Sequence, residues 1–240
     1  LRGLGVDCSY ASRDAERAWR FASRLRGRGG FGSYEAALAA PEVDAVLVAT
    51  PPALHADLTL AALRAGKHVG GEKPPFLRSA DFAPVEAAAR AAGRQVLVAE
   101  NYHYKPLART LRRLLADGVI GEVLFLHVNA LKRQVVSGWR TQPEMAGGGA
   151  LFEGGIHWVS FMAHLGLEVL DVRGFAAAPG RVEGGVVAVF AYAGGAVGTL
   201  FHSWEVPSPF GGLRGSRIYG RDGTIAFESN GLAVAVWGRR

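Results

Sequence analysis

The sequence has 240 residues, of which 49% are hydrophobic and 20% charged, and its formal net charge is +6. This length allows one large domain or two modest ones, with ample apolar material for a core. A single cysteine excludes an intramolecular disulfide, no apolar run reaches the roughly 18 residues that cross a bilayer, and no signal-peptide pattern opens the chain, so we expect a cytoplasmic protein without a membrane partner.

The positive charge comes mostly from arginines that are scattered along the chain. They form no basic stripe interleaved with stacking aromatic side chains, which a nucleic-acid-binding surface would need. We therefore interpret the charge as a solvated surface and expect no nucleic-acid partner. A nucleic-acid-binding protein remains an alternative that rests on the basic balance alone, and salt-sensitive binding to arbitrary DNA would support it.

The first part of the chain, to about residue 103, alternates short apolar runs with helical patterns. Strands are predicted over 5–11, 45–49, 68–70 and 96–99, and helices over 14–25, 33–39, 54–65 and 81–92. Ser12 is expected to cap the first helix and Ser33 the second, and the unbroken apolar run 45–49 predicts a strand buried on both faces. Strands that alternate with helices indicate βαβ units and a parallel sheet.

The pattern changes from about residue 104. After a helix over 106–116, alternating segments are predicted as strands over 123–134, 186–192, 197–204, 216–219, 224–228 and 232–237. Gly, Asp or Asn in the turns favours antiparallel pairing, and one helix over about 150–165 interrupts the strands. We therefore predict two domains: a parallel α/β domain over residues 1–103, then an α+β domain over 104–240 with a large, mostly antiparallel open sheet.

A glycine-rich segment over 27–32 matches the pattern G-x-G-x-x-G. In a dinucleotide site this loop must follow a strand and open a helix, so that free N–H groups face the pyrophosphate. Here the segment follows a predicted helix and precedes another turn. We interpret it as a flexible helix-to-strand loop and not as a phosphate site.

The segment Ala11-Ser12-Arg13 suggests where a nucleotide would bind. If residues 6–11 form the second strand of a nucleotide-binding domain, the domain is incomplete, because a βα unit of roughly 30 residues with the true glycine loop would lie upstream. A hydroxyl and a guanidinium at the end of that strand suit a 2′-phosphate, so NADP is favoured over NAD. Alternatively, Ser12 is only a helix cap and Arg13 only a solvated residue. Without the glycine loop we expect residues 1–240 alone to bind the cofactor weakly.

Three segments carry residues suited to chemistry. Thr50-Pro51 with His55 follows the strand predicted over 45–49, and Glu72-Lys73-Pro74 follows the next strand. Ligands bind at this carboxyl edge of an open α/β sheet. The third segment is a glycine run over 147–149, followed by Glu153 and His157 at i, i+4 on one face of the predicted helix.

Together, in this order, the three segments resemble the Gfo/Idh/MocA oxidoreductases, the family of glucose–fructose oxidoreductase and inositol dehydrogenase. Segments 101–104, 117–122 and 139–140 also look like family segments. The resemblance implies a Rossmann-type first domain and a second domain built on an open sheet that commonly packs against a partner, so a homo-oligomer is expected. It also implies hydride transfer between NAD(P) and a hydroxyl or carbonyl carbon of a sugar, cyclitol or related molecule.

The resemblance further implies roles for single residues. Lys73 would polarise the reacting oxygen beside the nicotinamide, His157 would donate or accept the proton, and Glu153 would orient His157 or bind substrate hydroxyls. Such groups suit the chemistry, because a proton must leave oxygen as hydride leaves carbon. The residues expected to bind the cofactor are Ser12, Arg13, Thr50, Pro51, His55, Glu72, Lys73, Asn101, Trp139 and Arg140, and those expected to bind the substrate are Lys73, Tyr102, Glu153 and His157.

Other interpretations of these residues remain open. His157 lies beside Trp158 and could be a core residue, and His55 could simply begin a helix. The family more often has Asp where this chain has Glu153, whose carboxylate reaches one methylene further, so a non-catalytic or regulatory nucleotide-binding member is an alternative function. No His, Cys or Asp cluster has metal-ligand spacing, so no metal is expected.

Overall fold

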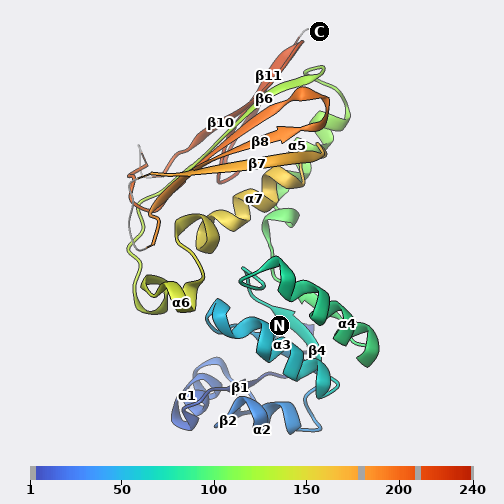
Figure 1. The fold of residues 1–240 in the computed structure, drawn as a ribbon, viewed down its shortest axis with the longest axis vertical. Coiled ribbons are helices and arrows are strands. Elements are labelled where there is room, and N and C mark those ends of the chain that lie inside the picture. Colours follow the sequence, from blue (N-terminus) through green and yellow to red (C-terminus); the bar gives the residue numbers. More distant parts are fainter. Residues whose placement is uncertain (1–3, 178–181, 209–211, 239–240) are drawn as a thin grey trace. The chain divides into compact units, whose positions relative to one another are not determined.

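The computed structural model describes residues 4–177, 182–208 and 212–238 (Figure 1). The chain divides into two compact units. The N-terminal unit comprises Leu1–Thr50 and Leu54–Val98, and the C-terminal unit comprises Pro51–Ala53 and Ala99–Arg240. Residues 99–103, which the sequence pattern groups with the first domain, thus belong to the second unit.

The N-terminal unit is a parallel α/β structure, as predicted. Its elements are β1 (Ser9–Ala11), α1 (Ala15–Leu25), β2 (Gly29–Phe31), α2 (Tyr34–Ala39), β3 (Ala45–Val48), α3 (His55–Arg64), β4 (His68–Gly71), α4 (Phe82–Ala92) and β5 (Val96–Val98). The strands form two parallel sheets, one with the order β1-β2 and one with the order β3-β4-β5. This confirms the expected Rossmann-type architecture.

Local signals set most of the helix ends in this unit. Ser33 caps α2, as predicted, by accepting a hydrogen bond from the Ala36 N–H at 3.0 Å. The cap of α1 is Asp14, which accepts from the Arg17 N–H at 3.1 Å, so the assignment of this cap to Ser12 is wrong. The Ser12 hydroxyl instead accepts from the N–H of the cap residue Asp14, two residues further along the chain, at 3.3 Å.

The glycine-rich segment 27–32 is not a flexible loop, which corrects the sequence interpretation. Gly29–Phe31 forms β2 and pairs in parallel with β1. A Cβ added to Gly30 would lie 2.8 Å from the backbone nitrogen of Trp19 and 2.9 Å from the carbonyl carbon of Ala18. The missing side chain therefore lets α1 pack directly onto the strand, which explains the glycine without a phosphate ligand.

The strand β3 is buried on one face only, and the prediction of burial on both faces is wrong. Val48 packs with Leu63, Val69 and Val85 in a core that α3 and α4 cover. On the opposite face Leu47 is 58% exposed. Neighbouring β5 places Leu97 on that same face, across Gly70, so this face of the three-stranded sheet is open over the described residues.

The C-terminal unit is built on one seven-stranded sheet, which confirms the predicted α+β architecture (Figure 1). Its elements are α5 (Pro106–Ala116), β6 (Val123–Leu131), α6 (Pro143–Ala146), α7 (Ile156–Ala163), β7 (Val169–Ala176), β8 (Gly185–Tyr192), β9 (Val197–Ser203), β10 (Gly215–Gly220), β11 (Gly223–Glu228) and β12 (Val234–Gly238). The order is β12-β11-β10-β6-β9-β8-β7, and every pair is antiparallel except β6 with β9. The edge strand β7 is not predicted by the sequence pattern.

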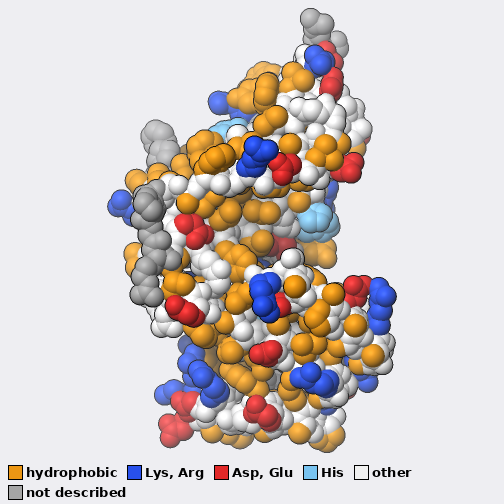
Figure 2. All heavy atoms as spheres, viewed as in Figure 1, with side chains coloured by type: hydrophobic (Ala, Val, Ile, Leu, Met, Phe, Trp, Pro, Cys, Tyr) orange, Lys and Arg blue, Asp and Glu red, His pale blue; other side chains and the backbone are white. Residues whose placement is uncertain are grey.

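The two faces of this sheet differ in burial. The core contains side chains of α5, α7 and one sheet face, among them Leu111, Leu126, Phe161 and Leu200. The opposite face, here called the outer face, carries Phe125, Phe175, Val197, Phe201 and Tyr219. Phe125 and Phe175 are 57% and 60% exposed, and Figure 2 shows hydrophobic side chains over the strands of this unit.

The helix predicted over 150–165 is not one regular α-helix. Leu151–Gly155 is a π-helical segment, and α7 continues from it. The π-turn adds a residue to the turn that separates Glu153 from His157, so the simple i, i+4 relationship on one α-helical face does not apply. Within the ranges that the structure describes, no helix is long and apolar enough to cross a membrane.

Candidate functional site

Polar side chains gather at the carboxyl ends of two paired strands in the N-terminal unit. Thr50 follows β3 and Glu72 follows β4, and the register Val48↔Gly71 puts these strand ends side by side. The Glu72 N–H donates to the Val48 carbonyl at 2.9 Å. The Thr50 hydroxyl oxygen is buried and has no hydrogen-bond partner among the described residues. A buried unpaired hydroxyl at this edge suits a ligand that supplies the missing partner.

His55 holds this edge together from inside. It is only 1% exposed and begins α3. Its Nε2 lies 2.8 Å from the Thr50 carbonyl oxygen, and its Nδ1 lies 2.9 Å from the Pro74 carbonyl oxygen. Both ring nitrogens are thus used within the chain, and they tie the segment after β3 to the segment after β4. Contact between His55 and the cofactor, expected from the sequence, stays a prediction.

Lys73 lies in the segment that follows β4, between Glu72 and Pro74. Its side chain is half-buried, and its backbone N–H donates to the Glu72 carboxylate at 3.2 Å. Pro74, whose carbonyl accepts from His55, follows directly. These hydrogen bonds hold the backbone on both sides of Lys73. Its side chain therefore extends from a fixed point at the end of β4.

Ser12 and Arg13 follow β1 at the carboxyl end of the other parallel sheet. The Ser12 N–H donates to the Phe31 carbonyl at 3.1 Å, which continues the β1–β2 pairing by one residue. The hydroxyl of Ser12 accepts from the Asp14 N–H and keeps its own proton for donation. Arg13 is exposed.

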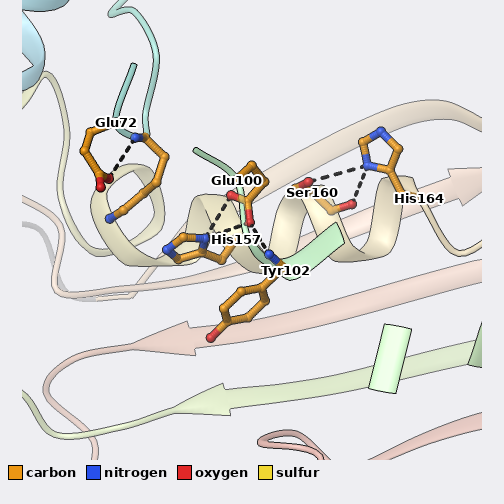
Figure 3. Close-up of polar contacts among 7 residues, drawn as sticks. Glu72, Glu100, Tyr102, His157, Ser160 and His164 are labelled. Carbon is orange, nitrogen blue, oxygen red and sulfur yellow. Dashed lines mark hydrogen bonds and ion pairs between the residues drawn. The ribbon is translucent and has the colours of Figure 1, made fainter. Parts of the chain in front are cut away.

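In the C-terminal unit a carboxylate and an imidazole form a close pair. Nδ1 of His157 lies 2.9 Å from one oxygen and 2.8 Å from the other oxygen of Glu100 (Figure 3). The exposed fractions of the two side chains are 18% for His157 and 16% for Glu100. His157 lies in the first turn of α7, and Glu100 follows β5 in the sequence. Nε2 of His157 points away from Glu100 and has no hydrogen-bond partner in the described part of the chain (Figure 3).

The sequence analysis missed Glu100. Its signal was available, because Glu100 directly follows the strand predicted over 96–99, just as Thr50 and Glu72 follow theirs. The sequence gives no sign that Glu100 contacts His157, because the two residues lie 57 positions apart.

Tyr102 packs against this pair. Its ring stacks on the imidazole of His157 with centroids 4.5 Å apart and planes 16° apart, and its backbone N–H donates to Glu100 at 2.8 Å. The ammonium of Lys105 lies 3.3 Å from the centroid of the Tyr102 ring. Burial, together with the nearby charge of Arg214, lowers the pKa of Lys105. Tyr102 and His157, both expected at the substrate, are thus in contact, and Glu100 and Lys105 lie beside them.

Glu153, Trp139 and Arg140 form a second group in the same unit. Glu153 is buried in the π-helical segment, and its carboxylate accepts from Nε of Arg140 at 3.0 Å. The guanidinium of Arg140 lies 4.3 Å from the ring centroid of Trp139, its neighbour in the chain. Asn101 is exposed, and Pro51 is half-buried. The carboxylate that contacts Nδ1 of His157 is that of Glu100, while the carboxylate of Glu153 contacts Arg140, so the role expected for Glu153 stays a prediction.

The glycines that surround Glu153 have a packing reason. A Cβ on Gly155 would lie 2.8 Å from the Leu151 side chain and 3.0 Å from the ring of His202. Burial lowers the pKa of His202 to about 4, so this ring is neutral at neutral pH.

The residues that the structure describes contain no cluster of three His, Cys, Asp or Glu that could hold a metal ion.

Two family models match the chain. The model described as an oxidoreductase family with an NAD-binding Rossmann fold matches residues 9–100, and that of the GFO/IDH/MocA C-terminal domain matches residues 108–226. The 1,5-anhydro-D-fructose reductase of Ensifer adhaerens is 36% identical over 163 residues, which are 65% of this chain and 48% of that protein. The chain spans about half the length of the curated relatives it matches.

Solved structures share the fold. An oxidoreductase domain protein from Kribbella flavida has a TM-score of 0.82 and 27% identity, covering 95% of this chain and 66% of that one. GenD2 from gentamicin A biosynthesis, solved in complex with NAD, has a TM-score of 0.82 and 28% identity, covering 93% and 65%. A Rossmann-type unit followed by a large open sheet therefore defines the class of this protein. The chain belongs to the Gfo/Idh/MocA oxidoreductase family.

Proposed function

We propose that this protein is an NAD(P)-dependent oxidoreductase that interconverts a hydroxyl and a carbonyl group on a sugar, cyclitol or related small molecule. One observation carries the proposal most directly: His157 is fixed by a carboxylate through Nδ1 and leaves Nε2 unbonded. A residue that moves a proton needs this combination of a held ring and a free nitrogen.

The chain's own residues would divide the chemistry as follows. In the oxidation direction, Nε2 of His157 accepts the hydroxyl proton, and the ammonium of Lys73 stabilises the charge that develops on the oxygen. Glu153 and Tyr102 would bind neighbouring hydroxyl groups of the substrate. A bound nicotinamide supplies the hydride acceptor or donor. The N-terminal unit would hold the cofactor and the C-terminal unit the substrate.

The residues at the strand ends fit a nicotinamide dinucleotide. The unpartnered hydroxyl of Thr50 is suited to hydrogen-bond the cofactor, and His55 holds the backbone of Thr50 in place. The other residues that we assign to cofactor binding are Pro51, Glu72, Asn101, Trp139 and Arg140. The family model is described as NAD-binding, and GenD2 was solved with NAD, which supports this class of cofactor. The donor pair Ser12 and Arg13 supports NADP over NAD, because both side chains suit a 2′-phosphate.

The sugar-like substrate class follows from the relatives. Ensifer adhaerens 1,5-anhydro-D-fructose reductase is named for a sugar-derived carbonyl, and we carry only this class, not the compound, to the present chain. A cytoplasmic location fits a protein with one cysteine and a nicotinamide cofactor.

The experiment is a spectrophotometric screen of sugars, polyols and their keto derivatives with NADH, NADPH and the oxidised forms. With a substrate in hand, His157→Asn should lower kcat roughly 100-fold or more. The matched control is His164→Asn, since His164 lies just after α7, is exposed, and its ring nitrogen lies within hydrogen-bond distance only of Ser160 among the described residues. Tight cofactor binding without turnover of any compound would instead support the regulatory, non-catalytic alternative.

A second copy of this chain is the partner that we propose for the outer face of the C-terminal sheet. That face presents aromatic and aliphatic side chains on adjacent strands, including Phe125, Val197 and Phe201. Exposed apolar patches of this kind mark interfaces between proteins. A sheet face can meet its own copy across a two-fold axis, as in most homo-oligomers.

A further inference from the structure

We propose that Glu100 is a positioning residue that fixes His157 in the tautomer with the proton on Nδ1. This inference rests on the proposed function and deepens it, because it says which nitrogen carries the reaction and what keeps it available. Glu100 lies 57 positions before His157, and neither the motif around His157 nor the glycine run points to it.

The hydrogen bonds decide the tautomer. Nδ1 of His157 faces two oxygens of Glu100, at 2.9 and 2.8 Å, and an ionised carboxylate can only accept. The proton must therefore be on Nδ1. A neutral imidazole carries one N–H, so Nε2 keeps its lone pair. Nε2 is the nitrogen that points away from Glu100 in Figure 3.

The carboxylate is itself held in place. The backbone N–H of Tyr102 donates to Glu100 at 2.8 Å, and this bond fixes the carboxylate relative to the chain that follows β5. The same residue stacks its ring on the imidazole at 4.5 Å. One residue thus orients both members of the pair: its backbone orients Glu100, and its ring limits rotation of His157 about its own side-chain bonds.

Lys105 holds the stacking ring in turn. Its ammonium lies 3.3 Å from the centroid of the Tyr102 ring, a distance typical of a strong cation–π contact. The positive charge of Lys105 also attracts the carboxylate of Glu100. The four residues Glu100, Tyr102, Lys105 and His157 therefore form one connected unit.

The proton balance of the reaction explains why a carboxylate is used. On oxidation the O–H bond of the substrate would break and its proton would move to Nε2, while a bound nicotinamide would supply the acceptor for the hydride of the C–H bond. His157 then carries N–H on both nitrogens and a positive charge, which Glu100 offsets without taking the proton itself. In the reverse direction Nε2 returns the proton to the oxygen as hydride reaches the carbon.

The first test reads the tautomer directly and needs no substrate. Side-chain ¹⁵N NMR of the histidines in the whole protein should give Nδ1–H and an unprotonated Nε2 for His157 near neutral pH. In Glu100→Gln, the amide can donate as well as accept, so the tautomer should shift toward Nε2–H. Glu100→Asp should keep Nδ1–H, and Glu168→Gln, which changes an exposed glutamate just after α7, should change nothing.

The second test reads catalysis. Glu100→Gln should lower kcat roughly 10- to 100-fold with less than about a threefold change in KM, and Glu100→Asp should recover part of the loss. Glu153→Gln should instead raise KM, because Glu153 is assigned to substrate hydroxyls. Circular dichroism confirms that each variant is folded.

The outcomes of these tests distinguish the proposed role of Glu100 from the proposed oxidoreductase function. An unchanged tautomer in Glu100→Gln, or a kcat within twofold of the parent protein, overturns the role of Glu100. A wild-type protein that has the Nδ1–H tautomer but turns over no compound in the screen contradicts the oxidoreductase function and leaves the hydrogen-bond assignment in place.

Discussion

Nε2 of His55 lies 2.8 Å from the carbonyl oxygen of Thr50, at the turn where β3 passes into α3. The contact fixes the backbone of Thr50 while its hydroxyl oxygen remains buried and without a partner among the described residues. Ligand sites commonly contain a side chain that is rigidly placed but lacks a hydrogen-bond partner. The stability lost in this way is offset when a ligand supplies the partner.

Thr50→Val should therefore separate stability from binding. Valine has nearly the shape of threonine and removes a hydroxyl that makes no hydrogen bond in the described structure, so the free energy of unfolding should stay the same or rise by about 1 kcal/mol. The affinity for the cofactor should fall several-fold. Urea unfolding and a fluorescence titration with the reduced cofactor measure the two quantities, and a loss of stability with unchanged affinity would contradict the assignment.

His55→Leu should destabilise the N-terminal unit. The substitution leaves the carbonyl oxygens of Thr50 and Pro74 without their partner in a buried region, which costs about 2 kcal/mol or more. Urea unfolding measures the loss. Asp57→Asn, an exposed change on the same helix α3, is the control and should leave the unfolding midpoint unchanged.

Arg13→Ala should change the choice of cofactor. If the guanidinium binds the 2′-phosphate, KM for NADPH should rise roughly tenfold, while KM for NADH should change little. Arg20→Ala removes another exposed arginine from α1 and should affect neither value. Equal effects of Arg13→Ala on both cofactors would show that Arg13 does not discriminate between them.

His202 should make the C-terminal unit less stable in mild acid. Its pKa is about 4 in the folded protein because of burial, against about 6.5 when unfolded, so between these values the unfolded chain binds more protons. Stability is then full above pH 6.5 and declines as the pH falls toward 4, by about 2 kcal/mol at pH 5. Urea unfolding at pH 7 and pH 5 tests this, and in His202→Gln the difference between the two pH values should shrink by that amount.

Phe125→Glu should weaken self-association through the outer face. Phe125 is exposed on β6, in the centre of the sheet, and a charge there would oppose burial against a second copy. Light scattering after size-exclusion chromatography should give a smaller particle for the variant than for the parent protein. Glu168→Gln leaves the outer face unaltered and should keep the parent size. A monomeric parent protein would contradict the proposed homo-oligomer.

The sequence predicts elements well where strong local signals coincide. α5 runs over Pro106–Ala116 as predicted, because a proline opens it and Asp117-Gly118 closes it. The paired strands β8 and β9 alternate buried and exposed side chains and were also predicted. β7 lacks this contrast, since nearly all of its side chains are exposed, and the prediction missed it.

The limits for the site have a similar physical origin. Thr50, Glu72 and Ser12 could be found because their positions depend on one local rule, the end of a parallel strand. The pairing of Glu100 with His157 depends on how α7 packs against the segment after β5, which no local pattern encodes. The glycine pattern at 27–32 shows the opposite error, since a motif that matches in letters is explained by the close approach of α1 to β2.

The position of β6 in the sheet has a consequence for how this unit folds. β6 is the first of the seven strands in the sequence, yet its neighbours are β9 and β10, so that Leu126 pairs with Gly198 and Ile218. These pairings close long loops, and proteins dominated by such contacts fold slowly. During synthesis β6 therefore emerges long before β9 and β10, and its apolar residues remain exposed and unpaired until those strands are made. Folding of this unit in the cell should thus be sensitive to chaperones that cover the exposed apolar residues of this strand.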